Sequence, residues 1–232
     1  MKIGVLDIQG SVEEHLESLR KLAKNGLNNF PKKSAKKADS PLDKPKNAMV
    51  PNLGEVIEPV LVKTVEQLRQ VSGLIIPGGE STTIGKLLRR FGLREEIIKL
   101  VKSGKLAVWG TCAGAILLAK KITGEQQADT LALMDIEVER NAYGRQLDSF
   151  ETQLEFDLGP AGAAYAGPGI PGVFIRAPRI VSIGKDVKIL AEYKGDVVAA
   201  RQKDMLATNF HPELTDSLEV HKYFVGMCDG NE

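Results

Sequence analysis

The sequence predicts an α/β fold in which a central, mostly parallel sheet is covered by helices on both faces. Short apolar runs alternate with segments of helical periodicity through the first half of the chain, and this alternation is typical of parallel strands joined by helical crossovers. The second half carries closely spaced strand-like runs, which we expect to add antiparallel strands to the same sheet. The 232 residues, 43% of them apolar, suffice for a single domain, 1–232, with a buried core.

In the first half, strand and helix follow each other in order. The first strand is expected at 2–8, and Ser11, with Glu14 at capping-box spacing, begins a helix. The apolar face of that helix carries Val12, His15, Leu16, Leu19 and Leu22. Further strands are expected at 55–63, 74–76 and 106–109, and helices after Thr64, at 82–90, at 94–102 and at 115–119.

In the second half, short strands are expected at 136–139, 153–156, 172–176, 187–193, 197–201 and 205–209, followed by a last helix at 216–227. Two segments interrupt the pattern. A lysine-rich insertion at 28–53 has too few apolar residues to form a core, so it is predicted to be a flexible, solvated loop rather than a contact for an acidic partner. The Gly/Ala/Pro-rich segment 159–172 is predicted to be a loop between strands.

Composition excludes several classes of function. The net charge is +1, so no bulk field would recruit nucleic acid or a membrane surface. Two distant cysteines are no disulfide framework, and the scattered cysteines and histidines show no metal-ligand spacing. No stretch has the character of a signal peptide or membrane span. We therefore expect a cytoplasmic protein that needs no metal or cofactor.

Cys112 lies in the segment G-T-C-A-G, between an apolar strand and the start of a helix. This is the spacing of a nucleophile elbow, in which glycines on either side let the chain turn sharply and present the nucleophile. The positive end of the following helix favours the thiolate form, and the Ala113 N–H is placed to donate to an oxyanion. The alternative is a small buried cysteine with a packing role. Cys228, near a polar C-terminus, is assigned no function.

A thiol nucleophile needs a base, and the chain has three histidines. His15 is expected to pack on the apolar face of its helix, and His221 to lie near the surface. His211 stands in F-H-P-E, where Pro212 favours an extended backbone and Glu213, two residues on, points the same way. Glu213 would then orient the imidazole, so Cys112, His211 and Glu213 are the predicted catalytic residues.

The segment P-G-G-E-S-T at 77–82 is a third candidate. It follows one predicted strand of the sheet as Cys112 follows another, and ligands gather at the carboxyl ends of parallel strands. A Pro-Gly-Gly turn leaves backbone N–H groups free to face a ligand, which makes Gly79 the candidate second oxyanion donor opposite Ala113. Alone, such a segment is usually only a turn.

G-T-C-A-G and F-H-P-E resemble the motifs of the class I, or triad, glutamine amidotransferases. The sequence resembles one branch more closely, the glutaminase subunits of pyridoxal 5′-phosphate synthase. The blocks that carry this resemblance are I-G-V-L-D-I-Q-G at 3–10, P-G-G-E-S-T-T at 77–83, V-E-R-N-A-Y-G-R-Q-L-D-S-F-E at 138–151, F-I-R-A-P-R-I at 174–180 and F-H-P-E-L-T at 210–215. The resemblance covers nearly the whole chain except the two loop segments. It implies the flavodoxin-like, three-layer α/β/α fold of class I glutaminases.

The resemblance also implies a function. The chain would hydrolyse L-glutamine to glutamate and ammonia through a cysteine thioester, and deliver the ammonia to a (β/α)8-barrel synthase subunit in a hetero-oligomeric complex that makes vitamin B6. The substrate-binding residues it implies are Gly79, Glu80, Ser81, Arg140, Ile175 and Arg176. An arginine suits the α-carboxylate of glutamine, although Arg140 and Arg176 are also compatible with a surface or interface role. Free glutaminases of this kind are almost inactive until the synthase docks.

Three alternatives stay open. The chain could be a stand-alone cysteine hydrolase on a related fold, which would need no glutamine pocket. It could serve a different acceptor synthase. It could also be a catalytically silent regulatory subunit, although an intact set of Cys112, His211 and Glu213 argues against that.

Overall fold

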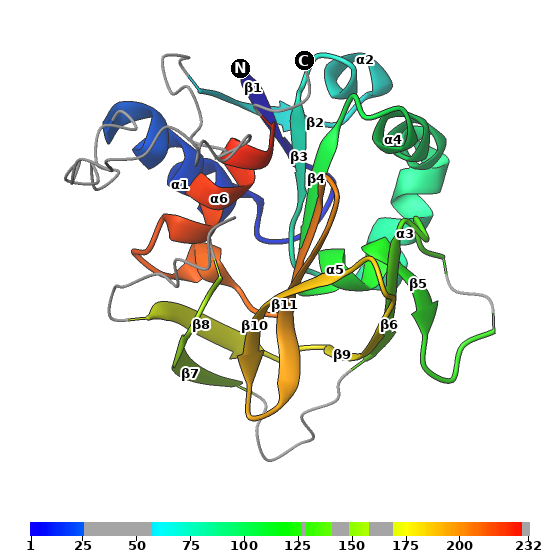
Figure 1. Cartoon of the computed structure of the whole chain (residues 1–232). Helices are drawn as coiled ribbons and strands as arrows, with labels where there is room; N and C mark the ends of the chain where they lie inside the picture. The colour runs from blue at the N-terminus through cyan, green and yellow to red at the C-terminus, as the bar shows by residue number, and fades with distance from the viewer. Residues whose placement is uncertain (26–56, 127–128, 141–148, 158–168, 229–232) are drawn as a thin grey trace, which may run out of the picture.

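The computed structural model describes residues 1–25, 57–126, 129–140, 149–157 and 169–228. Its centre is a curled ten-stranded sheet with the strand order β2-β1-β3-β4-β12-β11-β9-β6-β5, and β10 pairs with β11. Helices lie on both sides of this sheet (Figure 1). The predicted three-layer α/β/α fold with a largely parallel sheet is therefore confirmed.

Five parallel strands form the half of the sheet that carries the site. They are β1 (Lys2–Leu6), β2 (Glu58–Val62), β3 (Gly73–Ile76), β4 (Ala107–Thr111) and β12 (Met205–Thr208). The middle strands β3, β4 and β12 are buried along their whole length, as expected for strands covered on both faces. Since the five strands run in parallel, their carboxyl ends meet at one edge of the sheet.

The second half of the chain extends this sheet with short strands, as predicted. They are β5 (Ala119–Ile122), β6 (Met134–Glu139), β9 (Arg179–Ile183), β10 (Lys188–Tyr193) and β11 (Asp196–Gln202). β11 pairs antiparallel with β12, β10 and β9, and β9 pairs antiparallel with β6. Strands β5 and β9 were not anticipated. The apolar run after Cys112 is divided between a short helix and β5, and β9 has too few apolar residues to stand out.

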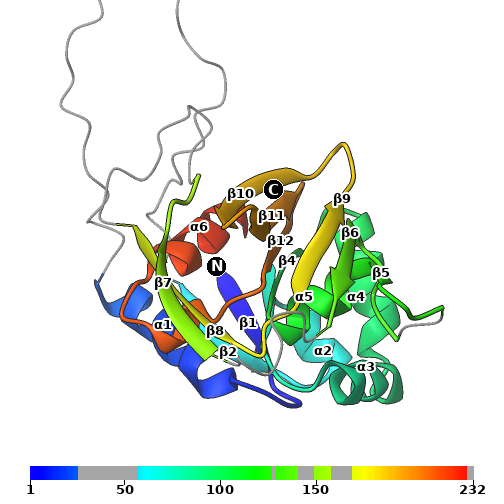
Figure 2. The ribbon, with the colours of Figure 1, turned by 90° about the horizontal axis from the view of Figure 1, so that it is seen from below.

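One part of the expectation for the second half is wrong. Strands β7 (Ser149–Leu154) and β8 (Ile170–Ile175) do not join the main sheet, but form a separate antiparallel pair. Their apolar side chains pack below α1 and α6, where Phe150 stacks on Phe174 with ring centroids 4.5 Å apart. Figure 2 shows this pair crossing the α1 side of the molecule. The hairpin closes one side of the site described below.

The helices divide between the two faces of the sheet. α1 (Val12–Asn25) and α6 (Glu219–Cys228) cover one face. The other face is covered by α2 (Val65–Leu68), α3 (Ser81–Arg90), α4 (Leu93–Lys102) and α5 (Ala113–Leu118). Alternate strand residues serve the two cores: Trp109 of β4 packs toward α6, whereas Val108 packs toward the opposite helices. α1 packs against α6, so the first and last helices of the chain are neighbours.

Several predicted boundaries shift. The strand expected at 55–63 is β2 (Glu58–Val62), and the strand expected at 153–156 is β7, which ends at Leu154. The last helix begins at Glu219, three residues after its predicted start. The insertion 28–53 and most of the segment 159–172 lie outside the described residues, but β8 begins at Ile170 within that segment. The organisation of 1–232 as a single domain stays a prediction.

Candidate active site

Cys112 occupies the sharp turn between β4 and α5. Its backbone has φ 48° and ψ −103°, which is strained for a residue with a side chain and is characteristic of a nucleophile on an elbow. The turn is held by a hydrogen bond from the Cys112 N–H to the carbonyl oxygen of Thr208 on β12, 2.8 Å long. The Cys112 side chain is 8% exposed, so the sulfur is shielded but reachable.

The two glycines that flank this turn allow α5 to lie close to the sheet. A Cβ atom on Gly114 would stand 2.1 Å from the carbonyl oxygen of Ile76, which belongs to β3. A Cβ atom on Gly110 would stand 2.3 Å from the backbone of Gly114. Neither position has room for a side chain, so the G-x-C-x-G spacing reflects close packing between backbone segments.

His211 and Glu213 follow β12 and form a hydrogen-bonded pair. Nδ1 of His211 lies 2.8 Å from Oε1 of Glu213. The predicted contact is present, but the predicted extended backbone beyond His211 is wrong. Pro212 starts a single 3-10 turn, Pro212–Leu214, and this turn brings the carboxylate back to the imidazole. The His211 N–H donates to the carbonyl oxygen of Val173 on β8, 2.7 Å away, which fixes the residue against the hairpin.

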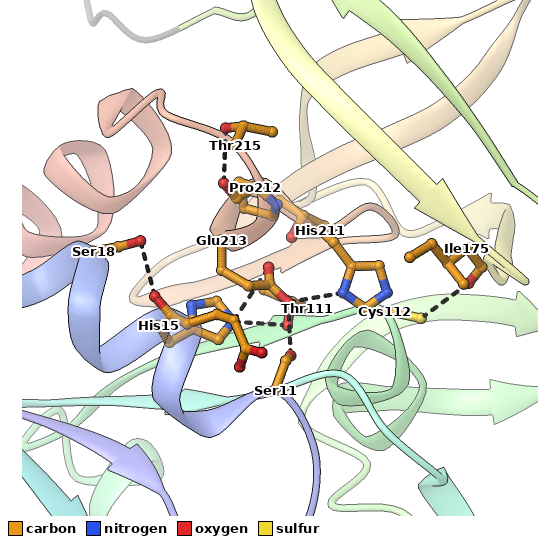
Figure 3. A network of polar contacts seen from close by, with 12 residues as sticks. Ser11, His15, Ser18, Thr111, Cys112, Ile175, His211, Pro212, Glu213 and Thr215 are labelled. Carbon is orange, nitrogen blue, oxygen red and sulfur yellow. Dashed lines mark hydrogen bonds and ion pairs between the residues drawn. The ribbon is translucent and has the colours of Figure 1, made fainter.

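The imidazole of His211 faces the Cys112 side chain (Figure 3). Burial would lower the pKa of His211, but hydrogen bonds with Cys112 and Glu213 raise it to about 10. These contacts favour an imidazolium beside a thiolate. In its thiol form the Cys112 sulfur also reaches the carbonyl oxygen of Ile175, 3.9 Å away. The ring of His211 packs directly on Gly78, where a Cβ atom would stand 2.4 Å from its Cε1.

Glu213 is buried, with 6% of its surface exposed, and is surrounded by donors. The hydroxyl of Ser11 donates to its Oε1 over 2.7 Å, and Nε2 of His15 lies 3.5 Å from its Oε2. Burial opposes ionisation of Glu213, but His15, His211 and Ser11 hold the pKa of this carboxyl at about 2. The Ser11 side chain, predicted as a helix cap, therefore contacts the predicted catalytic carboxylate instead.

A cavity of about 580 Å³ opens over Cys112. It is lined by every predicted site residue except Glu213, which lies behind His211: Gly79, Glu80, Ser81, Cys112, Ala113, Arg140, Ile175, Arg176 and His211. Gly78 and Ser11 also line it. The residues come from both halves of the chain, and the carboxyl ends of β3, β4 and β12 bring them together.

Arg140 is held at one side of this cavity. Its Nη1 donates to the hydroxyl of Ser81 over 2.6 Å, and its Nε forms an ion pair with Oε1 of Glu125 at 2.8 Å. The carboxylate of Glu80 caps α3 by accepting from the N–H groups of Thr82 and Thr83. The Thr83 hydroxyl and these N–H groups hold the pKa of Glu80 at about 2.

Sequence reasoning missed part of the polar network. His15 packs on the sheet as predicted but also contacts Glu213 and Thr111. His221 is fully buried, so the prediction of a surface position is wrong, because α6 turns this residue toward Trp109 and His15. Cys228 is also buried. The available signal was that the chain has three histidines, and all three converge behind the cysteine turn.

Comparisons with solved structures agree with this fold and site. A crystal structure of a glutamine amidotransferase is 39% identical, with a TM-score of 0.75 over 97% of this chain and 98% of that one. A GMP synthase-like protein from Thermoplasma acidophilum, 17% identical, shares the fold with a TM-score of 0.59. The architecture is thus that of the class I glutamine amidotransferases.

Residues 5–230 match the model of the SNO glutamine amidotransferase family, and the chain belongs to that family. A relative from Thermoanaerobacter pseudethanolicus, named pyridoxal 5′-phosphate synthase subunit PdxT, is 44% identical over 98% of this chain and 99% of its own length. The protein of the same name from Thermotoga maritima is 43% identical with the same coverage. The predicted family is confirmed, and a stand-alone hydrolase on a related fold is not favoured.

Two further properties concern the described part of the chain. It holds no cluster of three or more histidine, cysteine, aspartate or glutamate side chains arranged to bind a metal ion. It also holds no helix with the length and apolar character needed to cross a membrane.

Proposed function

We propose that this chain hydrolyses the side-chain amide of L-glutamine and supplies the ammonia to a pyridoxal 5′-phosphate synthase. The names of its relatives point to that synthase. The observation that carries the proposal is the series Cys112, His211 and Glu213, in which a strained cysteine faces an imidazole bonded to a buried carboxylate. This series borders a cavity of about 580 Å³, which is large enough for an amino acid.

The reaction would proceed by acyl transfer. The Cys112 thiolate attacks the amide carbon and forms a C–S bond, and the oxyanion is stabilised by the N–H groups of Ala113 and Gly79. The His211 imidazolium gives its proton to the departing nitrogen, the C–N bond breaks, and ammonia leaves. His211 then removes a proton from water, which attacks the thioester and releases glutamate. Glu213 keeps the Nδ1 proton of His211 in place throughout.

Substrate recognition is assigned to the residues around the cavity. Arg140, fixed by Ser81 and Glu125, is proposed to bind the α-carboxylate of glutamine. Ser81 and the backbone of Gly79 and Glu80 would complete the pocket on one side. Ile175 and Arg176 would complete it on the other, since the strained backbone of Arg176, φ 44°, directs this segment along the cavity wall. Arg140→Ala should therefore raise KM for glutamine, whereas a hydrolase of another substrate would be unaffected.

The partner is proposed to be a (β/α)8-barrel synthase subunit in a hetero-oligomeric complex. The Gly78 carbonyl accepts a hydrogen bond from the Ser11 N–H over 3.0 Å. This bond couples the start of α1 to the turn that carries Gly79. Docking of a synthase near α1 would reorient the Gly79 peptide and complete the oxyanion site.

The decisive measurement is ammonia release from L-glutamine by the purified chain, alone and with a pyridoxal 5′-phosphate synthase subunit. We expect weak release alone, strong release with the synthase, and none from Cys112→Ala. Cys228→Ala is the matched control, since that cysteine is buried away from the cavity. Equal activity of Cys112→Ala and the unaltered chain would refute the proposal.

A glutamine analogue that alkylates thiols tests the silent-subunit alternative. With the synthase present, we expect a single covalent adduct on Cys112, found by mass spectrometry of the digested protein. Excess glutamine should protect Cys112. An unmodified Cys112 under these conditions would indicate a regulatory subunit without catalysis.

A further inference from the structure

A buried pair of histidines lies behind Glu213 and has no part in the mechanism above. His15 comes from α1 and His221 from α6, and both are 0% exposed. Nδ1 of His15 lies 3.0 Å from Nε2 of His221. Both rings pack edge-on against Trp109, with centroid distances of 5.4 Å for His15 and 4.9 Å for His221.

The other nitrogen of His15 faces the catalytic side. Its Nε2 lies 3.2 Å from the hydroxyl oxygen of Thr111 and 3.5 Å from Oε2 of Glu213 (Figure 3). The two oxygens of Glu213 are unequally supported. Oε1 receives the Ser11 hydroxyl and Nδ1 of His211, whereas Oε2 is buried and has no hydrogen-bond partner within standard geometry among the described residues. His15 is thus the donor placed to supply Oε2.

Only one arrangement of protons suits these contacts. If His15 carried its proton on Nδ1, the lone pair of its Nε2 would face the negative Oε2 of Glu213, and His221 would bury an unpaired Nδ1–H. With the proton on Nε2 of each ring, His221 donates to His15, and His15 donates toward Thr111 and Glu213. The one unpaired atom, Nδ1 of His221, is then a lone pair, which is less costly to bury than a charge.

Both rings are neutral in this arrangement. Burial lowers the pKa of His15, although the nearby Glu213 opposes this effect. Burial, with some contribution from His15, also lowers the pKa of His221 well below its usual value. Each neutral imidazole then has one N–H and one lone pair, so the proton on His221 determines which nitrogen of His15 is free to donate.

We propose that His15 is a positioning residue for the glutaminase reaction: its Nε2–H orients the Glu213 carboxylate toward His211, and His221 fixes the His15 tautomer that can donate. The proposal rests on the proposed function only for its kinetic consequences. It extends the series of Cys112, His211 and Glu213 by two residues, one from each end of the chain.

A pair of variants separates donation from packing. His15→Met fills similar space without an N–H, whereas His15→Gln keeps a donor at the reach of Nε2. In the complex with the synthase, His15→Met should lower kcat roughly tenfold to a hundredfold with KM unchanged, the expected effect of losing one hydrogen bond to a charged group. His15→Gln should recover most of that rate. Equal losses in the two variants would overturn the donor role.

The proton positions are measured directly in the unaltered protein, which keeps the proposal testable even where a variant does not fold. Because the chain contains three histidines, long-range ¹⁵N–¹H spectra of ¹⁵N-histidine-labelled protein give three ring systems. At neutral pH we expect His15 and His221 to be neutral with the proton on Nε2. A proton on Nδ1 of either ring, or a protonated ring, would overturn the inference. Loss of activity in Cys112→Ala is a separate measurement, so failure of the proposed function is recognised independently.

Discussion

At the scale of single residues, the site depends on a carboxylate that is kept ionised although it is buried. Glu213 is 6% exposed, and its charge is balanced by hydrogen bonds from Ser11 and His211. A neutral side chain of the same shape would leave the imidazolium of His211 without a counter-charge during the reaction.

Glu213→Gln should therefore lower kcat for ammonia release roughly 10²- to 10⁴-fold, the range typical of losing one member of an acid–base pair. The measurement is steady-state kinetics with the synthase present. Glu17→Gln, a change on the exposed face of α1, is the control and should leave kcat unchanged. A kcat within about threefold of normal for Glu213→Gln would contradict the assigned role.

A second residue-scale prediction concerns Gly78, which has no functional group. The His211 ring occupies the space that a Cβ atom would need, 2.4 Å from Cε1. Gly78→Ala should displace the imidazole and lower kcat by at least about tenfold, since small misplacements of reacting groups are costly. The check is kcat together with the melting temperature.

Gly92→Ala is the matched control for Gly78→Ala. Gly92 has φ 69° and open space around it, so an alanine there strains the backbone without touching the site. It should lower stability by about 1 kcal/mol and leave kcat intact. An equal effect of both variants on kcat would show that Gly78 acts only through stability.

At the scale of elements, helix termini contribute both stability and chemistry. Thr64 begins α2 with a complete capping box, in which its hydroxyl accepts from Gln67 N–H and the Gln67 side chain accepts from Thr64 N–H. Thr64→Ala should lower the free energy of unfolding by about 1 kcal/mol, as measured by chemical denaturation. Because Thr64 does not line the cavity, kcat should stay the same. A lower kcat at unchanged stability would link α2 to the site.

Elements defined by local sequence were predictable, and those defined by distant contacts were not. The cysteine turn and the His211–Glu213 pair were predicted because each depends on residues within a short stretch: glycines around Cys112, and Pro212 between the two partners. The 3-10 turn at Pro212–Leu214 and the separate β7–β8 pair were missed. Strand periodicity shows which residues share a face, but it does not show which sheet a strand joins.

The same reasoning explains the histidines. An isolated histidine on an apolar helix face is compatible with simple packing, so nothing within α1 shows that His15 meets Glu213. The two residues are separated by nearly the whole length of the chain, and only the packing of α1 against α6 and β4 brings His15, His221 and Trp109 together. Ser11 was likewise assigned to its own helix, whereas its hydroxyl bonds to Glu213.

At the scale of the whole molecule, the buried histidines make folding stability depend on pH. The pKa values of His15 and His221 are lowered in the folded state, so below about pH 6.5 the unfolded chain binds protons that the folded chain does not. Stability should therefore fall as the pH falls, by up to about 1.4 kcal/mol per pH unit for each histidine. His211, with its pKa raised to about 10, is protonated in both states there and adds no slope.

Denaturant unfolding at about pH 7.5, 6.5 and 5.5 measures this effect. We expect a clear loss between the last two values, before most carboxylates titrate. His221→Leu removes one buried imidazole, so it should reduce the slope while leaving the sign unchanged. A pH-independent free energy of unfolding over this range would mean that both histidines remain protonated or accessible.

The position of β12 and α6 has a consequence for the synthesis of this protein on the ribosome. β12 inserts between β4 and β11, and α6 covers Trp109 and closes around His15. Until these last segments emerge, the nascent chain presents β4 as an open edge, and the reactive thiol has neither its base nor its carboxylate. Translation products that stop early are therefore expected to be inert and prone to aggregate, so catalysis begins only when the polypeptide is almost finished.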